Sequence, residues 1–184
     1  MKKRLLCCWL AAACLLGLVA CEQADFPVKV GETTISALPV RVVSLSPLTT
    51  EMLDAIGAAA HLVGRSDQCN YPSAAADQPS MGTVLNPDVD AIVASQASLV
   101  LTAAPLETDA MQRLESHGIT VLCLSAGETL DEVKENYVSL ATAMGGRNQG
   151  PANGERAYAM IREHLQAITD TLERQTPVKA CYLA

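Results

Sequence analysis

The first candidate for covalent chemistry is Cys21, which ends an apolar N-terminal run. Lys2-Lys3-Arg4 precedes an uncharged stretch from Leu5 to Ala20. That stretch is shorter than the roughly 20 residues that span a bilayer, and it has the form of an export signal. It ends in Leu18-Val-Ala-Cys21, a lipobox whose small residues suit a peptidase groove and whose thiol can accept diacylglycerol. We predict a lipoprotein signal peptide over 1–20 and lipidation of Cys21; an ordinary signal peptide and an uncleaved anchor are the alternatives.

The mature chain is strongly acidic. The sequence has 13 Lys and Arg and 20 Asp and Glu residues, and three of the basic residues leave with the signal. The remaining ten basic and twenty acidic residues give a net charge near −10. This charge argues against a nucleic-acid partner and against a basic patch for anionic lipid. Two or three acyl chains on Cys21 would instead hold the protein on a membrane.

The remaining cysteines do not form a metal-binding or redox motif. Three of the seven lie in the signal, and Cys69, Cys123 and Cys181 remain after Cys21, without a C-x-x-C pair. Cys123 lies in an apolar strand pattern, 120–124, so we expect it to be a buried free thiol. A disulfide between any two of the three stays open in an oxidising compartment.

Alternating apolar and amphipathic segments predict an α/β fold built on a parallel sheet. Turn residues at Gly31-Glu32 first indicate a hairpin of 26–30 with 34–38. Expected strands then alternate with expected helices, at 41–46, 49–56, 61–64, 86–95, 99–103, 107–117, 120–124 and 128–144. Thr49 or Thr50 is expected to cap the first helix, and Asn86 with Pro87 is expected to begin the second. Strands separated by about ten helical residues form right-handed βαβ units.

One break divides this region from a long helix. Gly145 to Pro151 interrupts the pattern, and an apolar stripe then marks a helix over about 155–174. Pro177 ends that helix, and 178–183 has the character of a strand without partners. We therefore expect a truncated chain whose second lobe is missing. The expected segments are a signal peptide at 1–20, a lipidated tether and hairpin at 21–38, a lobe at 39–150, an interlobe helix at 151–176 and a first C-terminal strand at 177–184.

The carboxyl ends of the expected strands are the expected ligand-binding edge. In open α/β sheets, ligands lie beyond these ends. The segments that follow the strands are 46–49, 65–71, 83–85, 103–106 and 125–127. Arg65 is the only cation near them, and its guanidinium could pair with oxygens of an iron chelate. The alternative for Arg65 is an ordinary surface role.

Several ordered segments resemble the substrate-binding proteins of ABC importers for iron–siderophores, haem and cobalamin, the Fe/B12 periplasmic-binding family. They are Phe26-Pro-Val, Arg41-Val-Val-Ser-Leu-Ser-Pro-Leu-Thr-Thr-Glu51, Leu62-Val-Gly64, Cys69-Asn-Tyr-Pro72, Gly82-Thr-Val-Leu-Asn-Pro-Asp-Val-Asp-Ala-Ile-Val93, Leu99-Val-Leu101 and Gly118-Ile-Thr-Val121. The resemblance implies two α/β lobes joined by one long helix, with the ligand between them. It also implies delivery to a permease and its ATPase, an extracytoplasmic location, and no covalent cofactor. A lipid-anchored protein would lie on the outer face of the cytoplasmic membrane, or in the periplasm or at the outer membrane of a two-membrane host.

The resemblance carries over to individual residues. Ser46-Pro47 and Tyr71 would line the ligand cleft; their alternatives are a turn that ends a strand and an ordinary packed aromatic. Asp90 matches an acidic position that contacts permease arginines, although the familiar residue is Glu. Its carboxylate would also suit the first turn of a helix.

The first lobe departs from the cobalamin binders of this family. Those proteins line the lobe with aromatic rings, whereas the matching ligand-facing positions here are Gln68, Val84 and Ala103. The departure lowers the expectation of a stacked corrin and leaves siderophore, haem or a differently held corrinoid open.

Three other classes compete with this interpretation. A metal-ion binding protein of a related two-lobed type would need converging ligands. The histidines are expected at a strand start, a helix end and on the long helix: His61, His117 and His164. An enzyme is not expected, because no G-x-S-x-G, Walker or G-x-G-x-x-G motif occurs. The third class is a surface lipoprotein without a transport role.

Overall fold

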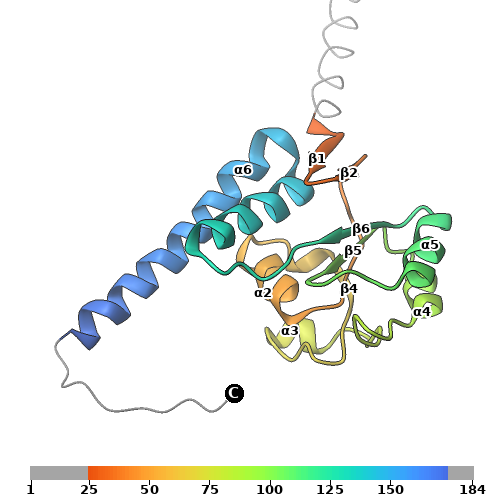
Figure 1. Ribbon diagram of the computed structural model, residues 1–184, viewed down its shortest axis with the longest axis horizontal. Coiled ribbons are helices and arrows are strands. Elements are labelled where there is room, and N and C mark those ends of the chain that lie inside the picture. Colours follow the sequence, from red (N-terminus) through yellow and green to blue (C-terminus); the bar gives the residue numbers. More distant parts are fainter. Residues whose placement is uncertain (1–24, 174–184) are drawn as a thin grey trace, which may run out of the picture.

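A computed structural model describes residues 25–173 (Figure 1). The predicted signal peptide, Cys21, Cys181 and the expected strand at 177–184 lie outside the described residues. In chain order the elements are β1 (Val28–Val30), β2 (Thr33–Ile35), β3 (Val42–Ser44), α2 (Pro47–Ala55), the 3-10 turn η2 (Ala59–His61), β4 (Leu62–Arg65), α3 (Ser73–Ala76), α4 (Val89–Ala94), β5 (Leu99–Thr102), α5 (Thr108–Ser116), β6 (Thr120–Cys123) and α6 (Leu130–Leu172).

The predicted parallel sheet is confirmed. Its four strands lie in the order β4-β3-β5-β6, and every neighbouring pair is parallel. β5 is buried along its whole length, from Leu99 to Thr102, because both faces of the sheet are covered. Such βαβ units need a helix on each crossover, which is why strands and helices alternate along the sequence.

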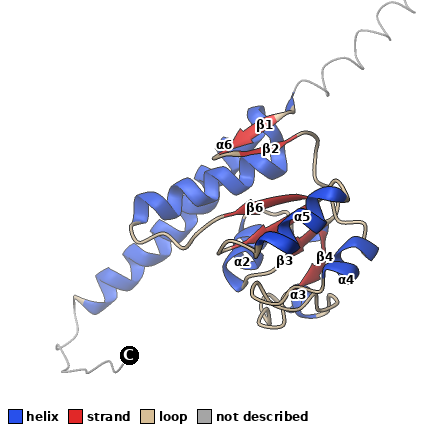
Figure 2. Ribbon diagram, turned by 45° about the vertical axis from the view of Figure 1, so that its right-hand side comes forward, coloured by secondary structure: helices blue, strands red, loops and turns tan. Residues whose placement is uncertain are grey.

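Two apolar cores lie on opposite faces of the sheet. On one face, α2 and α6 contribute Leu53 and Leu140, which share a core with Leu101 of β5. On the other face, α4 and α5 contribute Ile92 and Leu114. The views from two directions show this three-layer arrangement, with the β1–β2 hairpin beside α6 (Figure 2).

The hairpin is also confirmed. β1 and β2 are antiparallel and pair Val28 with Ile35 across the turn at Gly31, whose φ of 55° suits glycine. The Thr33 hydroxyl donates to the Val121 carbonyl at 3.3 Å and ties the hairpin to β6.

Two helices begin at other residues than expected. Thr49 and Thr50 lie inside α2, which begins at Pro47 with Ser46 at its N-cap position. Proline has no N–H to leave unpaired in a first turn and its φ is already helical, so it sets the start. Asn86 and Pro87 lie before α4, whose N-cap is Asp88. The Asp88 carboxylate accepts from the Ala91 N–H at 2.9 Å.

α6 is a helical hairpin rather than one rod. Its first arm begins after Thr129, whose hydroxyl and Glu132 form a capping box. The predicted break is present at Gly146, where φ is 73° and the chain reverses. The second arm begins directly after Gly146, earlier than position 155, and continues through Pro151 to Leu172. Both views show the two arms side by side (Figure 2).

Two glycines let the arms approach closely. A Cβ at Gly150 would lie 2.6 Å from the Ala141 carbonyl oxygen, and a Cβ at Gly154 would lie 2.5 Å from the Val138 Cα. Lys134 and Glu155 form an ion pair between the arms at 3.3 Å. The packing therefore depends on backbone-to-backbone contact.

The end of the second arm leaves the lobe. Ala157 and Tyr158 are buried, whereas Leu165, Ile168 and Leu172 are 41%, 54% and 62% exposed. Figure 1 shows this part of α6 projecting beyond the sheet. Among residues 25–173, no helix is both long and apolar enough to cross a membrane.

Tyr137 makes the folded protein less stable at alkaline pH. Burial of this residue in the core shared by α2 and α6, reinforced by the negative charge of Glu51, raises the pKa of its hydroxyl above its ordinary value of 10.0. The unfolded chain therefore ionises Tyr137 at a lower pH than the folded chain does. The stabilisation is present below pH 10 and is lost as pH rises through the folded pKa.

We expect the free energy of unfolding to fall more steeply between pH 9 and pH 11 in the wild type than in Tyr137→Phe. Urea unfolding at several pH values measures both slopes, and titration of the other groups affects both proteins equally. Parallel slopes would contradict the assignment.

Candidate functional site

The site is built where the order of the strands reverses. From β3 the chain moves outward to β4 and then crosses to β5 on the other side of β3. The segments after β3 and β5 therefore run to opposite faces of the sheet, which is the position where ligands bind in open α/β sheets. Ser46, Pro47 and Ala103 follow these two strands, and the Leu45 N–H donates to the Leu101 carbonyl at 2.8 Å between them. The structure thus brings these three predicted residues to one edge.

The start of α2 has backbone donors at this edge. Ser46 is 8% exposed, and its side chain makes no capping hydrogen bond to α2. The first turn of α2 contains no acidic side chain. A helix start of this kind favours an anionic group on a ligand.

A buried hydroxyl cluster supports the edge from below. The Ser44 hydroxyl lies 2.7 Å from the Thr49 hydroxyl and 2.8 Å from the Thr50 hydroxyl, which also lies 3.1 Å from the Cys69 Sγ. The Ser46 carbonyl accepts from the hydroxyls of Ser44, Thr49 and Thr50 at 3.1, 3.2 and 2.9 Å. Sequence reasoning missed this cluster. The sequence feature that could have indicated the cluster is a run of small polar residues at positions where an amphipathic helix would have apolar ones.

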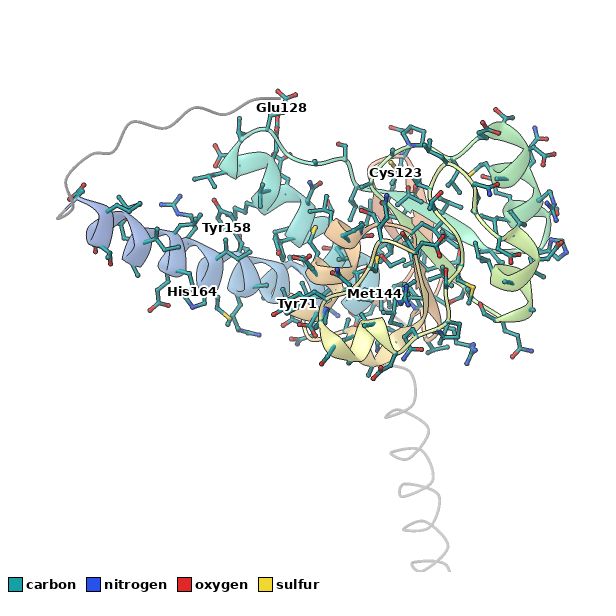
Figure 3. The ribbon with its side chains drawn as sticks, turned by 90° about the horizontal axis from the view of Figure 1, so that it is seen from below. Tyr71, Cys123, Glu128, Met144, Tyr158 and His164 are labelled. Carbon is teal, nitrogen blue, oxygen red and sulfur yellow. The ribbon has the colours of Figure 1, made fainter. Side chains whose placement is uncertain are left out.

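Arg65 is the last residue of β4 and makes two side-chain hydrogen bonds within its own lobe. Its Nε donates to the Ala76 carbonyl at 3.1 Å and its Nη1 donates to the Ser66 carbonyl at 2.9 Å. Gln68 is exposed in the following loop, and Tyr71 is 62% exposed (Figure 3). The loop therefore presents polar and aromatic surface.

Val84 lies in the next loop. It is partly buried and packs against the core on the α4–α5 side. The adjacent Leu85 is 80% exposed. Gly82 has a φ of 79° at the base of this loop, a conformation that favours glycine. Leu85 was not among the predicted site residues, although an exposed leucine in a loop is a signal of contact surface.

The predicted burial of Cys123 is wrong. Cys123 is exposed, whereas Cys69 is the buried thiol, and both are free. Cys123 is the last residue of β6, which among residues 25–173 is an edge strand that pairs with β5 alone. Its partner in that pairing, Thr102, is fully buried instead. Beyond β6, Ser125, Gly127 and Glu128 line a depression of about 340 Å³ on the same edge of the sheet.

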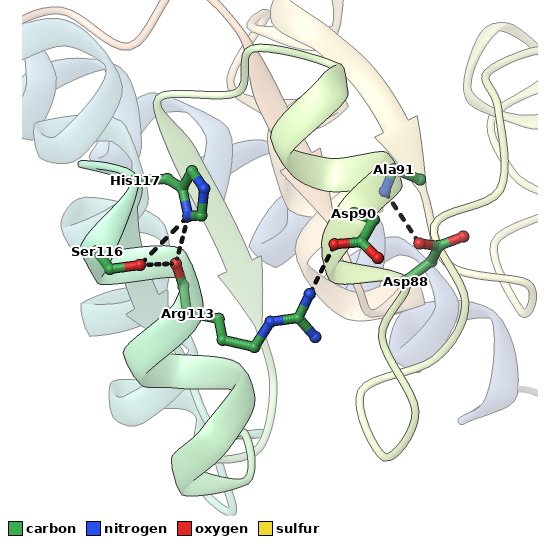
Figure 4. Close-up of polar contacts among 6 residues, drawn as sticks. All are labelled: Asp88, Asp90, Ala91, Arg113, Ser116 and His117. Atoms are coloured by element: carbon green, nitrogen blue, oxygen red, sulfur yellow. Dashed lines mark hydrogen bonds and ion pairs between the residues drawn. The ribbon is translucent and has the colours of Figure 1, made fainter.

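Asp90 lies on the first turn of α4 and forms an ion pair with α5. Its Oδ1 lies 2.6 Å from the Arg113 Nη2, and the side chains of Asp90 and Arg113 are 89% and 46% exposed (Figure 4). The neighbouring Asp88 serves as the helix cap through its Oδ1. On α5, Nδ1 of His117 lies 2.8 Å from the Arg113 carbonyl.

The histidines lie on separate elements. His61 ends η2, His117 follows α5, and His164 lies on the projecting part of α6 (Figure 3). In the part of the chain that the structure describes, no three His, Cys, Asp or Glu side chains converge on a metal position.

A family model described as periplasmic binding protein matches residues 42–184, well over half of the sequence. The chain belongs to the periplasmic binding protein family. The resemblance inferred from the sequence is thereby confirmed, and so is the expectation of a binding protein rather than an enzyme. The match includes every predicted ligand-facing residue and Asp90.

Individual relatives agree with this membership. The vitamin B12-binding protein of Vibrio campbellii is 27% identical over 144 residues, covering 77% of this chain and 50% of that protein. An uncharacterized ABC transporter substrate-binding lipoprotein of Bacillus subtilis is 28% identical over 128 residues, covering 65% and 40%. The crystal structure of a periplasmic haem-binding protein from Pseudomonas aeruginosa matches with a TM-score of 0.65 at 26% identity, covering 72% and 47%. The chain therefore spans half or less of the length of these relatives.

Proposed function

We propose that the whole protein is the extracytoplasmic solute-binding component of an ABC importer. It captures an iron complex, such as haem or a ferric siderophore, or a corrinoid, and delivers it to a membrane permease. The observation that carries this proposal is the family match over a lobe whose strand ends meet at a topological switch point. The similarity to vitamin B12-binding and haem-binding proteins supports the ligand class.

The ligand is held between this lobe and a second one. The exposed apolar side chains of Leu165, Ile168 and Leu172 support this, since a projecting apolar helix face is stabilised when another domain covers it. The half-length match to the relatives agrees. The second arm of α6 then serves as the interlobe helix; it begins before the expected segment 151–176 and contains residues 151–172 of it.

Ser46, Pro47, Gln68, Tyr71, Val84 and Ala103 form the ligand-facing edge of this lobe. Tyr71 is the one aromatic side chain among them, so it provides the main apolar wall for a macrocycle or a chelate. Backbone N–H groups at the start of α2 would donate hydrogen bonds to a ligand carboxylate. The edge therefore suits an anionic chelate or a haem better than a corrin stacked between several rings.

The membrane anchor is the lipidated Cys21. The Bacillus relative that is named as a lipoprotein supports this assignment. A short tether at 22–25 would keep the lobe within reach of the permease and raise its local concentration there without fixing its orientation.

Asp90 is the permease contact of this lobe. An exposed ion pair contributes at most about 1 kcal/mol, so a permease arginine can displace Arg113 from Asp90 at little cost. We expect Asp90→Ala to weaken docking to the permease–ATPase complex about 5-fold at low salt and to leave ligand affinity unchanged. Ligand-stimulated ATPase activity of the reconstituted importer measures docking.

Asp54→Ala is the matched control, because Asp54 is an exposed carboxylate on α2, across the sheet from α4. Equal losses for Asp54→Ala and Asp90→Ala would indicate a general charge effect. Unchanged docking by Asp90→Ala would contradict the assignment.

The proposed function is tested by a thermal-shift panel on the full-length mature protein. The probes are haemin, a ferric hydroxamate siderophore, cyanocobalamin and Zn²⁺. A ligand at one hundred times its Kd stabilises the folded state by about 2.7 kcal/mol, a shift of several degrees. A rise with one organic ligand supports the proposal, a rise with Zn²⁺ alone favours a metal-ion binder, and no rise favours a lipoprotein without a transport role.

A further inference from the structure

Arg65 joins the two ends of the loop that carries Gln68 and Tyr71. Its backbone N–H donates to the Pro79 carbonyl at 3.0 Å, and its carbonyl accepts from the Met81 N–H at 2.7 Å. Its side chain reaches into the same loop and donates to the Ala76 and Ser66 carbonyls. One residue therefore holds the loop over 66–80 at its beginning, near its middle and at its end.

The loop is also fixed to the hydroxyl cluster below it. The Cys69 N–H donates to the Ser66 carbonyl at 3.0 Å, and the buried Cys69 thiol lies 3.1 Å from the Thr50 hydroxyl. Above these contacts Tyr71 is mostly exposed and depends on the loop backbone for its position.

We propose that Arg65 is a positioning residue that pre-organises the Tyr71 loop and does not itself contact the ligand. The proposal rests on the proposed function and changes the role that the sequence indicated for Arg65. The guanidinium donates from Nε and Nη1 to two carbonyls of its own loop, so the fork is directed into the protein. A planar fork can satisfy two carbonyls at fixed positions, which a lysine ammonium does not reproduce. A loop held in its bound shape loses less conformational entropy when the ligand binds.

The test compares Arg65→Lys with Arg41→Lys. Arg41 is a matched control because its Nε also donates to a backbone carbonyl, that of Ser95 at 2.7 Å, but far from the loop along the chain. In the full-length protein without ligand, we expect Arg65→Lys to speed amide hydrogen exchange at 67–78 at least ten-fold. Exchange in β5 should stay unchanged, and Arg41→Lys should leave the loop unchanged.

Ligand affinity is then measured in a double-mutant cycle with Tyr71→Ala. The probe is haemin, the ferric hydroxamate siderophore or cyanocobalamin, whichever binds saturably. Arg65→Lys should weaken binding about 10-fold alone and less than 2-fold when Tyr71 is already alanine, because the loop then has no ring to position. Equal losses of affinity in both backgrounds would show direct contact between Arg65 and the ligand and overturn the proposal. Unchanged amide hydrogen exchange in the loop of Arg65→Lys would also overturn it. If none of the three probes binds, the proposed function fails, whereas hydrogen exchange still decides whether Arg65 holds the loop.

Discussion

Replacing Gly150 or Gly154 with alanine should destabilise the protein by about 2–3 kcal/mol each, although alanine favours helices more than glycine. In an isolated helix the same change would stabilise by roughly 1 kcal/mol. Here each new methyl group would meet backbone of the opposite arm: the Ala141 carbonyl oxygen for Gly150, and the Val138 Cα for Gly154. Backbone atoms cannot rotate away as a side chain can, so the arms must separate.

The measurement is urea unfolding or Tm, with an expected decrease of about 5–12 °C. Ala159→Gly is the matched control, because Ala159 is exposed on the same arm and should lose only its helix propensity, about 1 kcal/mol. A Gly154→Ala protein as stable as the wild type would contradict the close approach of the arms.

Replacing Tyr71 with alanine should weaken ligand binding about 10- to 100-fold, or roughly 1.4–2.8 kcal/mol. The ring is the largest exposed apolar surface among the ligand-facing residues of this lobe. An aromatic side chain that a ligand covers buries about 150–250 Å² of surface. Because Tyr71 is 62% exposed without ligand, its removal should leave the unfolding free energy within about 0.5 kcal/mol of the wild type.

Tyr71→Phe separates the ring from its hydroxyl. It should keep most of the affinity if the ring packs on the ligand, and it should behave like Tyr71→Ala if the hydroxyl coordinates or hydrogen-bonds the ligand. Titration of the full-length protein with haemin or cyanocobalamin measures both variants. Affinity unchanged in Tyr71→Ala would remove this residue from the ligand-facing edge.

The two predictions concern different parts of one mechanism. The α6 hairpin fixes the arm that would carry the second lobe, and the Tyr71 loop forms this lobe's share of the cleft. A loss of stability at Gly154 and a loss of affinity at Tyr71 should therefore be separable, because Thr50 of α2 and Arg65 of β4 hold the Tyr71 loop by hydrogen bonds.

The sequence by itself determined the fold class, the hairpin and the break before the second arm. These features depend on local pattern: alternating strands and helices, a glycine turn at Gly31, and Gly145-Gly146 ahead of Pro151. It also placed Ser46, Pro47 and Ala103 at one edge, since parallel strands all end on the same side. Periodicity and turn chemistry act over a few residues, so one sequence suffices to recognise them.

Only the tertiary structure decided which side chains those elements bring together. Asp90 and Arg113 are 23 residues apart and meet because α4 and α5 share a face. Cys123 is exposed because β6 is an edge strand, and Cys69 is buried because its loop folds back onto Thr50. Arg65 turns into its own loop because the Ser66 and Ala76 carbonyls lie within its reach. Strand order and long-range contacts are set by how the two cores pack, and no local pattern records that packing.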